Sequence, residues 1–288
     1  MSRGLQLVLL LFIPSAIFAA VSFAEIFGKD RGAAYDYVVR LDLPPLDRAK
    51  DLPTIAGPQD ASRPLVVIDA GHGGFDPGAG QGALKEKDVA LAIALLVRER
   101  LLEGGGIRVA MTREDDRFLT LTERPRIARE LGADLFVSIH ADSAESDQAR
   151  GASVYVLSER GSSQAAARFA ARENKADVVN GISLSQTSDI VSAILLDLSQ
   201  QEAQAGSLGA AELVLRELRE KLPLHYDGVE SAALAVLKAP DIPSILIESG
   251  YISNLEDAAY LNSPEGRSTV AEAAAQAIRA YFARRAGA

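Results

Sequence analysis

The chain has 288 residues, 48% of them hydrophobic, and carries 30 Lys and Arg against 39 Asp and Glu, a net charge of -9. This acidic balance argues against a general nucleic-acid-binding protein, because phosphate neutralisation needs clustered Lys and Arg. The sequence contains no cysteine, which excludes disulfides, thiolate metal sites and cysteine nucleophiles. Its three histidines stand at positions 72, 140 and 225, so a site that uses imidazole has few candidates.

The first 24 residues have the pattern of a secretory signal peptide. Arg3 precedes an apolar run at 5–13, and the small-x-small triplet at 22–24 predicts cleavage directly after it. A stretch of about 20 apolar residues is also just long enough for an uncleaved membrane anchor. In either case we expect the rest of the chain to be exported, to the periplasm. Residues 25–63 contain several prolines and no clear period, which predicts a linker or loosely packed arm.

From residue 64 onward, short apolar runs alternate with helical patterns. Continuous apolar runs are typical of strands buried on both faces, and an apolar spacing near 3.6 indicates helices. The predicted strands are 65–69, 107–112, 134–140, 152–157, 233–237 and 244–248, and the predicted helices are 88–102, 119–131 and 269–284. This alternation predicts an α/β fold, with a mostly parallel sheet and helices on both faces.

Residues 158–222 interrupt the alternation. Two helical patterns, at 163–176 and 188–222, are separated here by a polar loop that contains Gly181. We therefore expect a helical insertion or a long crossover connection in this part of the chain.

Four polar residues fall where predicted strands end or where the first helix begins. His140 and Glu248 each end a predicted strand, His72 lies in the glycine-rich loop after the first strand, and Glu86 begins the next helix. Because the carboxyl ends of parallel strands meet at one sheet edge, we expect these residues to gather there. Two imidazoles and one carboxylate are a common ligand set for catalytic zinc. A further carboxylate must then carry a proton, and Glu248 is the candidate.

Each of these residues also has an ordinary structural explanation. A histidine beside a glycine loop commonly serves a turn, a glutamate at a helix start commonly caps it, and Glu248 could form a salt bridge. The expected convergence of four polar residues, including His72 and His140, favours the metal site.

Four sequence blocks resemble those of a known family. They are VVIDAGHGGFDPGA at 66–79 followed by Glu86, TREDD at 112–116 with Arg124, SIHAD at 138–142, and VLKAPDIPSILIESGYISN at 236–254. In this order they resemble the zinc-dependent N-acetylmuramoyl-L-alanine amidases of the cell-separation type, over a catalytic domain at 64–288. The resemblance implies that His72, Glu86 and His140 bind Zn²⁺ and that Glu248 is the catalytic carboxylate. It also implies hydrolysis of the amide between the lactyl group of N-acetylmuramic acid and L-alanine in peptidoglycan, in cell separation or wall remodelling.

Amidases of this type carry a helix that blocks the active site with a glutamate on zinc. Residues 172–177, RENKAD, resemble that helix, so the resemblance implies Glu173 as an autoinhibitory ligand. An activator protein is then expected to dock on the helical insertion, with its contact at the apolar residues Ile190, Ile194, Leu195 and Leu198. The alternatives are that Glu173 lies on an exposed helix face and that the second helix packs on the sheet.

Two other functions stay open. The same ligand set serves other zinc-dependent amide hydrolases, such as deacetylases and peptidases, and the same fold could serve as a non-catalytic wall-binding module. Such a module would be expected to lose a ligand or Glu248, and this sequence keeps all four residues. We expect membrane contact only through an uncleaved N-terminal segment. Residues 25–63 are too short for the wall-targeting domain that many separation amidases carry, which leaves septal targeting in doubt. His225 lies away from the strand ends, outside the expected site.

Overall fold

The computed structural model describes residues 52–287 except 145, 177, 180–181 and 184–192. The predicted signal peptide, most of the predicted linker, Ile190 and the side chains of Ile194, Leu195 and Leu198 therefore lie outside the described residues. None of the described helices is both long and apolar enough to cross a membrane.

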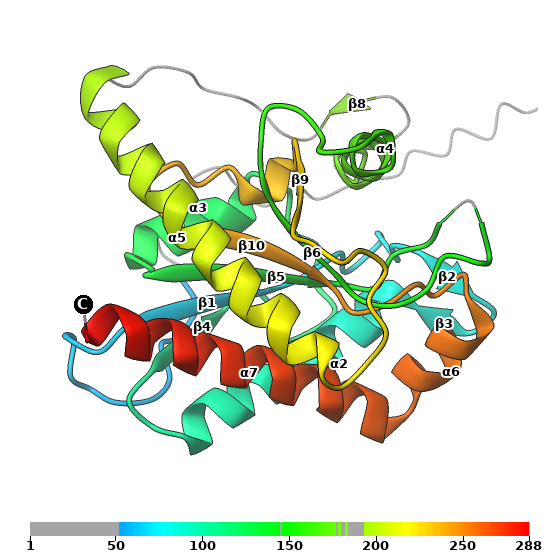
Figure 1. Ribbon diagram of the computed structural model, residues 1–288, viewed down its shortest axis with the longest axis horizontal. Coiled ribbons are helices and arrows are strands. Elements are labelled where there is room, and N and C mark those ends of the chain that lie inside the picture. Colours follow the sequence, from blue (N-terminus) through cyan, green and yellow to red (C-terminus); the bar gives the residue numbers. More distant parts are fainter. Residues whose placement is uncertain (1–51, 145, 177, 180–181, 184–192, 288) are drawn as a thin grey trace, which may run out of the picture. The chain divides into compact units, whose positions relative to one another are not determined.

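A six-stranded sheet lies at the centre, in the strand order β4-β1-β5-β10-β6-β9 (Figure 1). The strands are β1 (Leu65–Ala70), β4 (Arg108–Met111), β5 (Leu135–His140), β6 (Ser153–Leu157), β9 (Glu230–Ala232) and β10 (Ser244–Glu248). Neighbouring strands are parallel except β10 and β6, which run antiparallel. The predicted mostly parallel sheet is thus confirmed.

Helices cover both faces of this sheet, as predicted. One face packs against α2 (Glu86–Glu103), α5 (Ala193–Arg219), α6 (Leu255–Asn262) and α7 (Pro264–Ala286). The other packs against α3 (Glu123–Leu131), α4 (Gln164–Glu173) and the 3₁₀ helix η1 (Ala235–Leu237). Successive strand residues point to opposite faces, so Val66 belongs to the first core and Val67 to the second. Figure 1 shows α5 and α7 side by side.

The region 158–222 contributes to the core. In α5, Leu213, Val214 and Leu218 are buried against the sheet. The second predicted helix of this region therefore packs on one face of the sheet. Helix α6 and two short hairpins were not predicted. The hairpins are β2 (Gly80–Gln81) with β3 (Leu84–Lys85) and β7 (Val178–Val179) with β8 (Ile182–Ser183).

The predicted strand at 233–237 is wrong. The strand of this region, β9, ends at Ala232, and residues 235–237 form η1. Leu234 and Val236 are buried, so the apolar run gave no means of separating strand from helix. The Ala235 N–H donates to Asn174 Oδ1 at 2.8 Å, a side chain just beyond α4, and so does not join a strand ladder.

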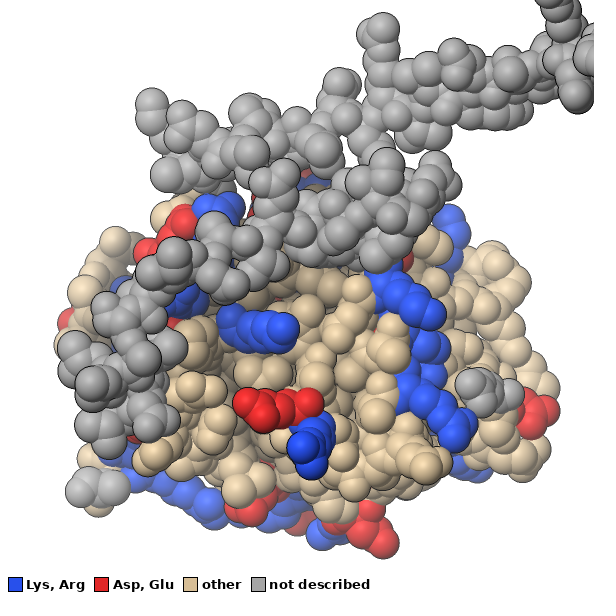
Figure 2. Space-filling model, turned by 90° about the horizontal axis from the view of Figure 1, so that it is seen from above, with Lys and Arg blue, Asp and Glu red and all other residues tan. Residues whose placement is uncertain are grey.

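Strand register brings the predicted site residues to one edge. Ala70 pairs with Ile139 across β1 and β5, and His140 pairs with Glu248 across β5 and β10. Alternation along the strands turns His140 and Glu248 toward the face that carries α4. Figure 2 shows the molecule from above the view of Figure 1, and on this face Lys and Arg form a row at the right.

Candidate metal site

The loop after β1 holds His72 in one orientation. His72 has φ +57°, the only positive φ at a non-glycine residue in the described part of the chain. Its Nδ1 lies 2.7 Å from Asp76 Oδ2, and the Gly78 N–H donates to the other oxygen of Asp76 at 3.1 Å. An ionised carboxylate only accepts hydrogen bonds, so His72 Nδ1 carries the proton and Nε2 presents a lone pair.

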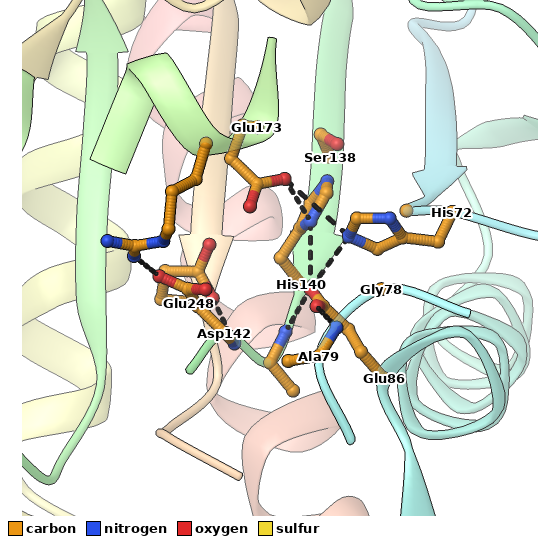
Figure 3. Close-up of polar contacts among 12 residues, drawn as sticks. His72, Gly78, Ala79, Glu86, Ser138, His140, Asp142, Glu173 and Glu248 are labelled. Carbon is orange, nitrogen blue, oxygen red and sulfur yellow. Dashed lines mark hydrogen bonds and ion pairs between the residues drawn. The ribbon is translucent and has the colours of Figure 1, made fainter. Parts of the chain in front are cut away.

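Four donor atoms converge at the sheet edge (Figure 3). His72 Nε2 lies 3.1 Å from Glu86 Oε1 and 3.5 Å from Glu173 Oε2. His140 Nδ1 lies 3.0 Å from Glu86 Oε1 and 3.3 Å from Glu173 Oε2. All four residues are buried, none more than 7% exposed. His72, His140 and Glu173 alone already form a group in which the ligand atoms lie within 4.8 Å of one another.

Hydrogen bonds satisfy only part of this cluster: His140 Nδ1 is hydrogen-bonded to Glu86 Oε1 at 3.0 Å, whereas His72 Nε2 has no hydrogen-bond partner among the described residues. Although His72 Nε2 lies near Glu86, its geometry gives no hydrogen bond, and acceptors buried without a donor are costly. The pKa of His72 also shows that this position favours a positive charge. Burial opposes protonation, but the Glu86 carboxylate and the Asp76 hydrogen bond raise this pKa well above its usual value. Ligands at about 2.0–2.1 Å from a tetrahedral zinc lie about 3.3–3.4 Å apart. The observed 3.0–3.5 Å separations and the donor types fit that ion.

Backbone groups and glycines shape the cluster. Glu86 begins α2, where its Oε2 accepts the Ala79 N–H at 2.8 Å and its Oε1 accepts the Ala141 N–H at 3.0 Å. A Cβ on Gly71 would lie 2.5 Å from the His140 ring, and one on Gly78 would lie 2.6 Å from Glu86 Oε2. Glycine is required at both positions because the His140 and Glu86 side chains occupy that space.

Glu248 lies beside the cluster and is fully buried. Its Oε2 accepts the Asp142 N–H at 2.9 Å, whereas its Oε1 has no hydrogen-bond partner among the described residues. Burial, together with the carboxylates of Asp142, Glu86 and Glu173, raises the pKa of Glu248 well above its usual value. A carboxyl group with a raised pKa can take up and return a proton near neutral pH.

Glu173 reaches the cluster as the last residue of α4. The helix packs on the sheet through Phe169, whose ring stacks on Tyr155 of β6 with centroids 4.5 Å apart. Arg172 forms an ion pair with Asp142, the residue whose N–H binds Glu248. The end of α4 therefore covers one side of a cavity of about 440 Å³, which the glycine loop and residues 142–144 also line.

A buried polar network supports the His72 loop from below. Asp69 Oδ1 accepts the Thr112 hydroxyl at 2.7 Å and Arg124 Nη1 at 2.9 Å, and its Oδ2 accepts the Ser138 hydroxyl at 2.7 Å. Arg124 also donates to the His72 carbonyl at 2.9 Å. The charge of Asp69 thereby orients the arginine that holds the loop.

The structure brings together all the residues singled out from the sequence for this site: His72, Glu86, His140, Glu173 and Glu248. Glu173 is buried, so the alternative of an exposed helix face is wrong.

His225 lies outside the site, with its Nδ1 3.2 Å from the Arg150 carbonyl oxygen. Sequence reasoning assigned no role to Asp76, Asp142 or Arg172. The signal for the two aspartates was their place inside the glycine-loop and SIHAD blocks.

Fold and site together define an α/β protein with a buried cluster of two histidines and two glutamates at the carboxyl edge of its sheet. The family model of N-acetylmuramoyl-L-alanine amidases named Amidase_3 matches residues 66–280. The chain therefore belongs to the N-acetylmuramoyl-L-alanine amidase family.

Individual relatives agree with this assignment. The chain is 41% identical over 220 residues to N-acetylmuramoyl-L-alanine amidase AmiA of Escherichia coli K12, covering 76% of each chain. The solved amidase AmiC2 of Nostoc punctiforme is 30% identical with a TM-score of 0.55, over 76% of this chain and 97% of that one. The CwlD amidase of Clostridioides difficile, solved in complex with the GerS lipoprotein, is 25% identical with a TM-score of 0.55, over 76% and 98%.

Proposed function

We propose that the chain hydrolyses the amide bond between the lactyl group of N-acetylmuramic acid and L-alanine in peptidoglycan, with Zn²⁺ held by His72, Glu86 and His140. The observation that carries the metal assignment is the convergence of two imidazole nitrogens on one Glu86 oxygen, at 3.0 and 3.1 Å, inside a buried cluster. Bound there, zinc would polarise the amide carbonyl and lower the pKa of a water molecule to about 7.

The chain's own residues supply orientation and proton transfer. Asp76 keeps the proton of His72 on Nδ1, and the N–H groups of Ala79 and Ala141 hold Glu86 in place. Glu248 takes the proton of the attacking water and returns it to the alanine nitrogen as the C–N bond breaks. The products are the lactyl carboxylate and a free N-terminal alanine. The raised pKa of Glu248 suits both proton transfers.

The position of Glu173 supports autoinhibition. Its Oε2 faces both imidazole nitrogens, so the carboxylate takes the place that a water molecule or substrate oxygen needs. Withdrawal of the end of α4 would free that place, and an activator protein acting on residues 158–222 would be the means. The CwlD structure, solved with a bound lipoprotein, supports partner binding by amidases of this fold. We further propose that residues 1–24 direct export to the periplasm, where the enzyme serves cell separation or wall remodelling.

The test supplies purified sacculi and zinc to the full chain and measures new N-terminal alanine on released stem peptides. Glu173→Ala should raise the basal rate, and a chelator should abolish it. Adding Glu248→Gln, which keeps the side-chain size, should lower the rate at least about 100-fold while bound zinc stays unchanged.

Other outcomes would identify the alternatives. Bound zinc without any new alanine terminus would overturn the amidase proposal. Released acetate would instead indicate a deacetylase, and a cut within the stem peptide would indicate a peptidase. Binding to sacculi without any product would indicate a wall-binding module. Activity that survives Glu248→Gln would remove Glu248 from the mechanism.

A further inference from the structure

Two buried polar atoms beside the site lack partners and lie on facing strands. They are Glu248 Oε1 and Ser153 Oγ. Neither has a hydrogen bond of standard geometry to a described residue, although the Tyr251 side chain lies within bonding reach of the Ser153 hydroxyl. Both residues are 0% exposed. In the antiparallel pairing of β10 with β6, Glu248 lies directly opposite Ser153.

Register places the two side chains on the same face of the sheet. Directly opposite residues of an antiparallel pair have Cβ atoms about 4.5–5.5 Å apart and point to the same side. Two residues along each strand, Tyr155 and Leu246 belong to the core on the α4 side. Because side chains alternate with a period of two, Ser153 and Glu248 also point to this side, where the site lies.

The hydroxyl groups of Tyr155 and Tyr251 also lie near the Glu248 carboxylate, but neither forms a hydrogen bond with its Oε1. The charged groups that act on it most strongly are carboxylates, those of Asp142, Glu86 and Glu173, and the one backbone hydrogen bond, from Asp142, serves Oε2. An ionised oxygen buried without a donor is costly. The Ser153 hydroxyl carries one hydrogen that rotates to suit its acceptor, so it is suited to supply the missing bond.

We propose that Ser153 is a positioning residue whose hydroxyl donates to Oε1 of Glu248 during the reaction. With the Asp142 N–H on Oε2, the carboxylate is then held by a donor on each oxygen. Each carboxylate oxygen has two lone pairs, so Oε1 keeps one for the proton it takes and returns. The inference rests on the proposed function for the role of Glu248 in proton transfer.

The kinetic test adds Ser153→Ala to the chain carrying Glu173→Ala, with zinc and sacculi as above. We expect kcat to fall about 10- to 100-fold, as when a residue orienting a catalytic group is lost, with KM within about twofold and zinc content unchanged. Ser153→Thr, which keeps the hydroxyl, should restore most of kcat. A kcat within about twofold of the parent in Ser153→Ala would overturn the proposal.

Ser249→Ala is the matched control. Ser249 is 2% exposed, its Oγ also lacks a partner among the described residues, and it follows Glu248 directly. It lines a cavity with Asp257 and Tyr260 of α6, on the opposite face of the sheet. This variant should leave kcat within about twofold, since its hydroxyl points away from Oε1. An equal loss in both variants would indicate a general packing effect and would also overturn the proposal.

A stability measurement tests the contact between Ser153 and Glu248 without an activity assay. Unfolding of the full chain in urea, with a chelator present, is compared for Ser153→Ala, Glu248→Ala and the double variant. A direct contact should couple the two sites by about threefold or more in the unfolding equilibrium constant, whereas independent sites show no coupling. Absence of coupling would overturn the proposal. If the Glu173→Ala parent releases no alanine, the amidase proposal fails, and this cycle still decides the role of Ser153.

Discussion

The ion pair between Arg172 and Asp142 allows the closed end of α4 to be weakened without altering a proposed metal ligand. The Asp142 side chain is 5% exposed and that of Arg172 is 38% exposed. Breaking a fully buried pair costs about 3–5 kcal/mol, but solvent access to Arg172 screens this one. We therefore expect Arg172→Ala to destabilise the closed position by about 1–2 kcal/mol. Since 1.4 kcal/mol is a factor of ten, the open fraction and the basal rate should rise about 5- to 30-fold.

The assay is the release of N-terminal alanine from sacculi by the full chain with zinc and no other protein. Lys175→Ala removes an exposed positive charge close to the end of the same helix and should leave the rate within about twofold. An unchanged rate in Arg172→Ala would refute the idea that the ion pair holds the helix. Equal increases in both variants would attribute the effect to the charge of the region.

Two further variants test the groups that support the site. In Asp76→Asn, the new amide can donate to His72 Nδ1, which would move the imidazole proton to Nε2, the nitrogen proposed to bind zinc. Zinc affinity, measured by competition with a chelating dye, should then fall about 10- to 100-fold. An unchanged affinity would contradict the role of Asp76. Asp69→Asn should lower the free energy of unfolding at pH 7 by about 3 kcal/mol, because it leaves the buried Arg124 without its carboxylate. Burial alone would raise the pKa of Asp69, but Arg124, Thr112 and Ser138 outweigh it and the pKa is lowered. Its stabilisation is thus present above the usual pKa of aspartate and is lost as pH falls through the depressed value. Urea denaturation should therefore show the difference from wild type shrinking in acid, and a constant difference would contradict this.

The parts of the fold that were predictable from the sequence are those in which burial and topology act together. Fully buried strands such as β1 and β5 appear as continuous apolar runs, and the carboxyl ends of parallel strands share an edge. His140 and Glu248 were therefore expected at the same edge of the sheet, and their register pairing confirms this placement. Their chemical roles stay predictions.

The rest depends on contacts that leave no periodic signal. Residues 233–237 are as apolar as a strand, and the Asn174 side chain bonded to Ala235 N–H shows why they do not form one. Asp76 contacts His72 in a loop where the backbone φ of His72 is +57°. No local sequence pattern predicts this conformation, so the contact could not be predicted either. Glu173 was identified only from the family resemblance. The local sequence of its helix is equally compatible with an exposed position for this glutamate.

Glu173 stands at the carboxyl end of α4, where the helix dipole is negative and disfavours a carboxylate. Its position is therefore maintained by the two imidazoles that it faces and by the ion pair of Arg172 with Asp142 more than by the helix itself. If Glu173 is one of the donors to the metal, closure and metal binding are thermodynamically linked. The factor by which zinc favours the closed helix must equal the factor by which closure tightens zinc. A partner that withdraws Glu173 would then also lower the affinity of the enzyme for zinc. The activated state would therefore lose zinc at a higher free zinc concentration than the closed state.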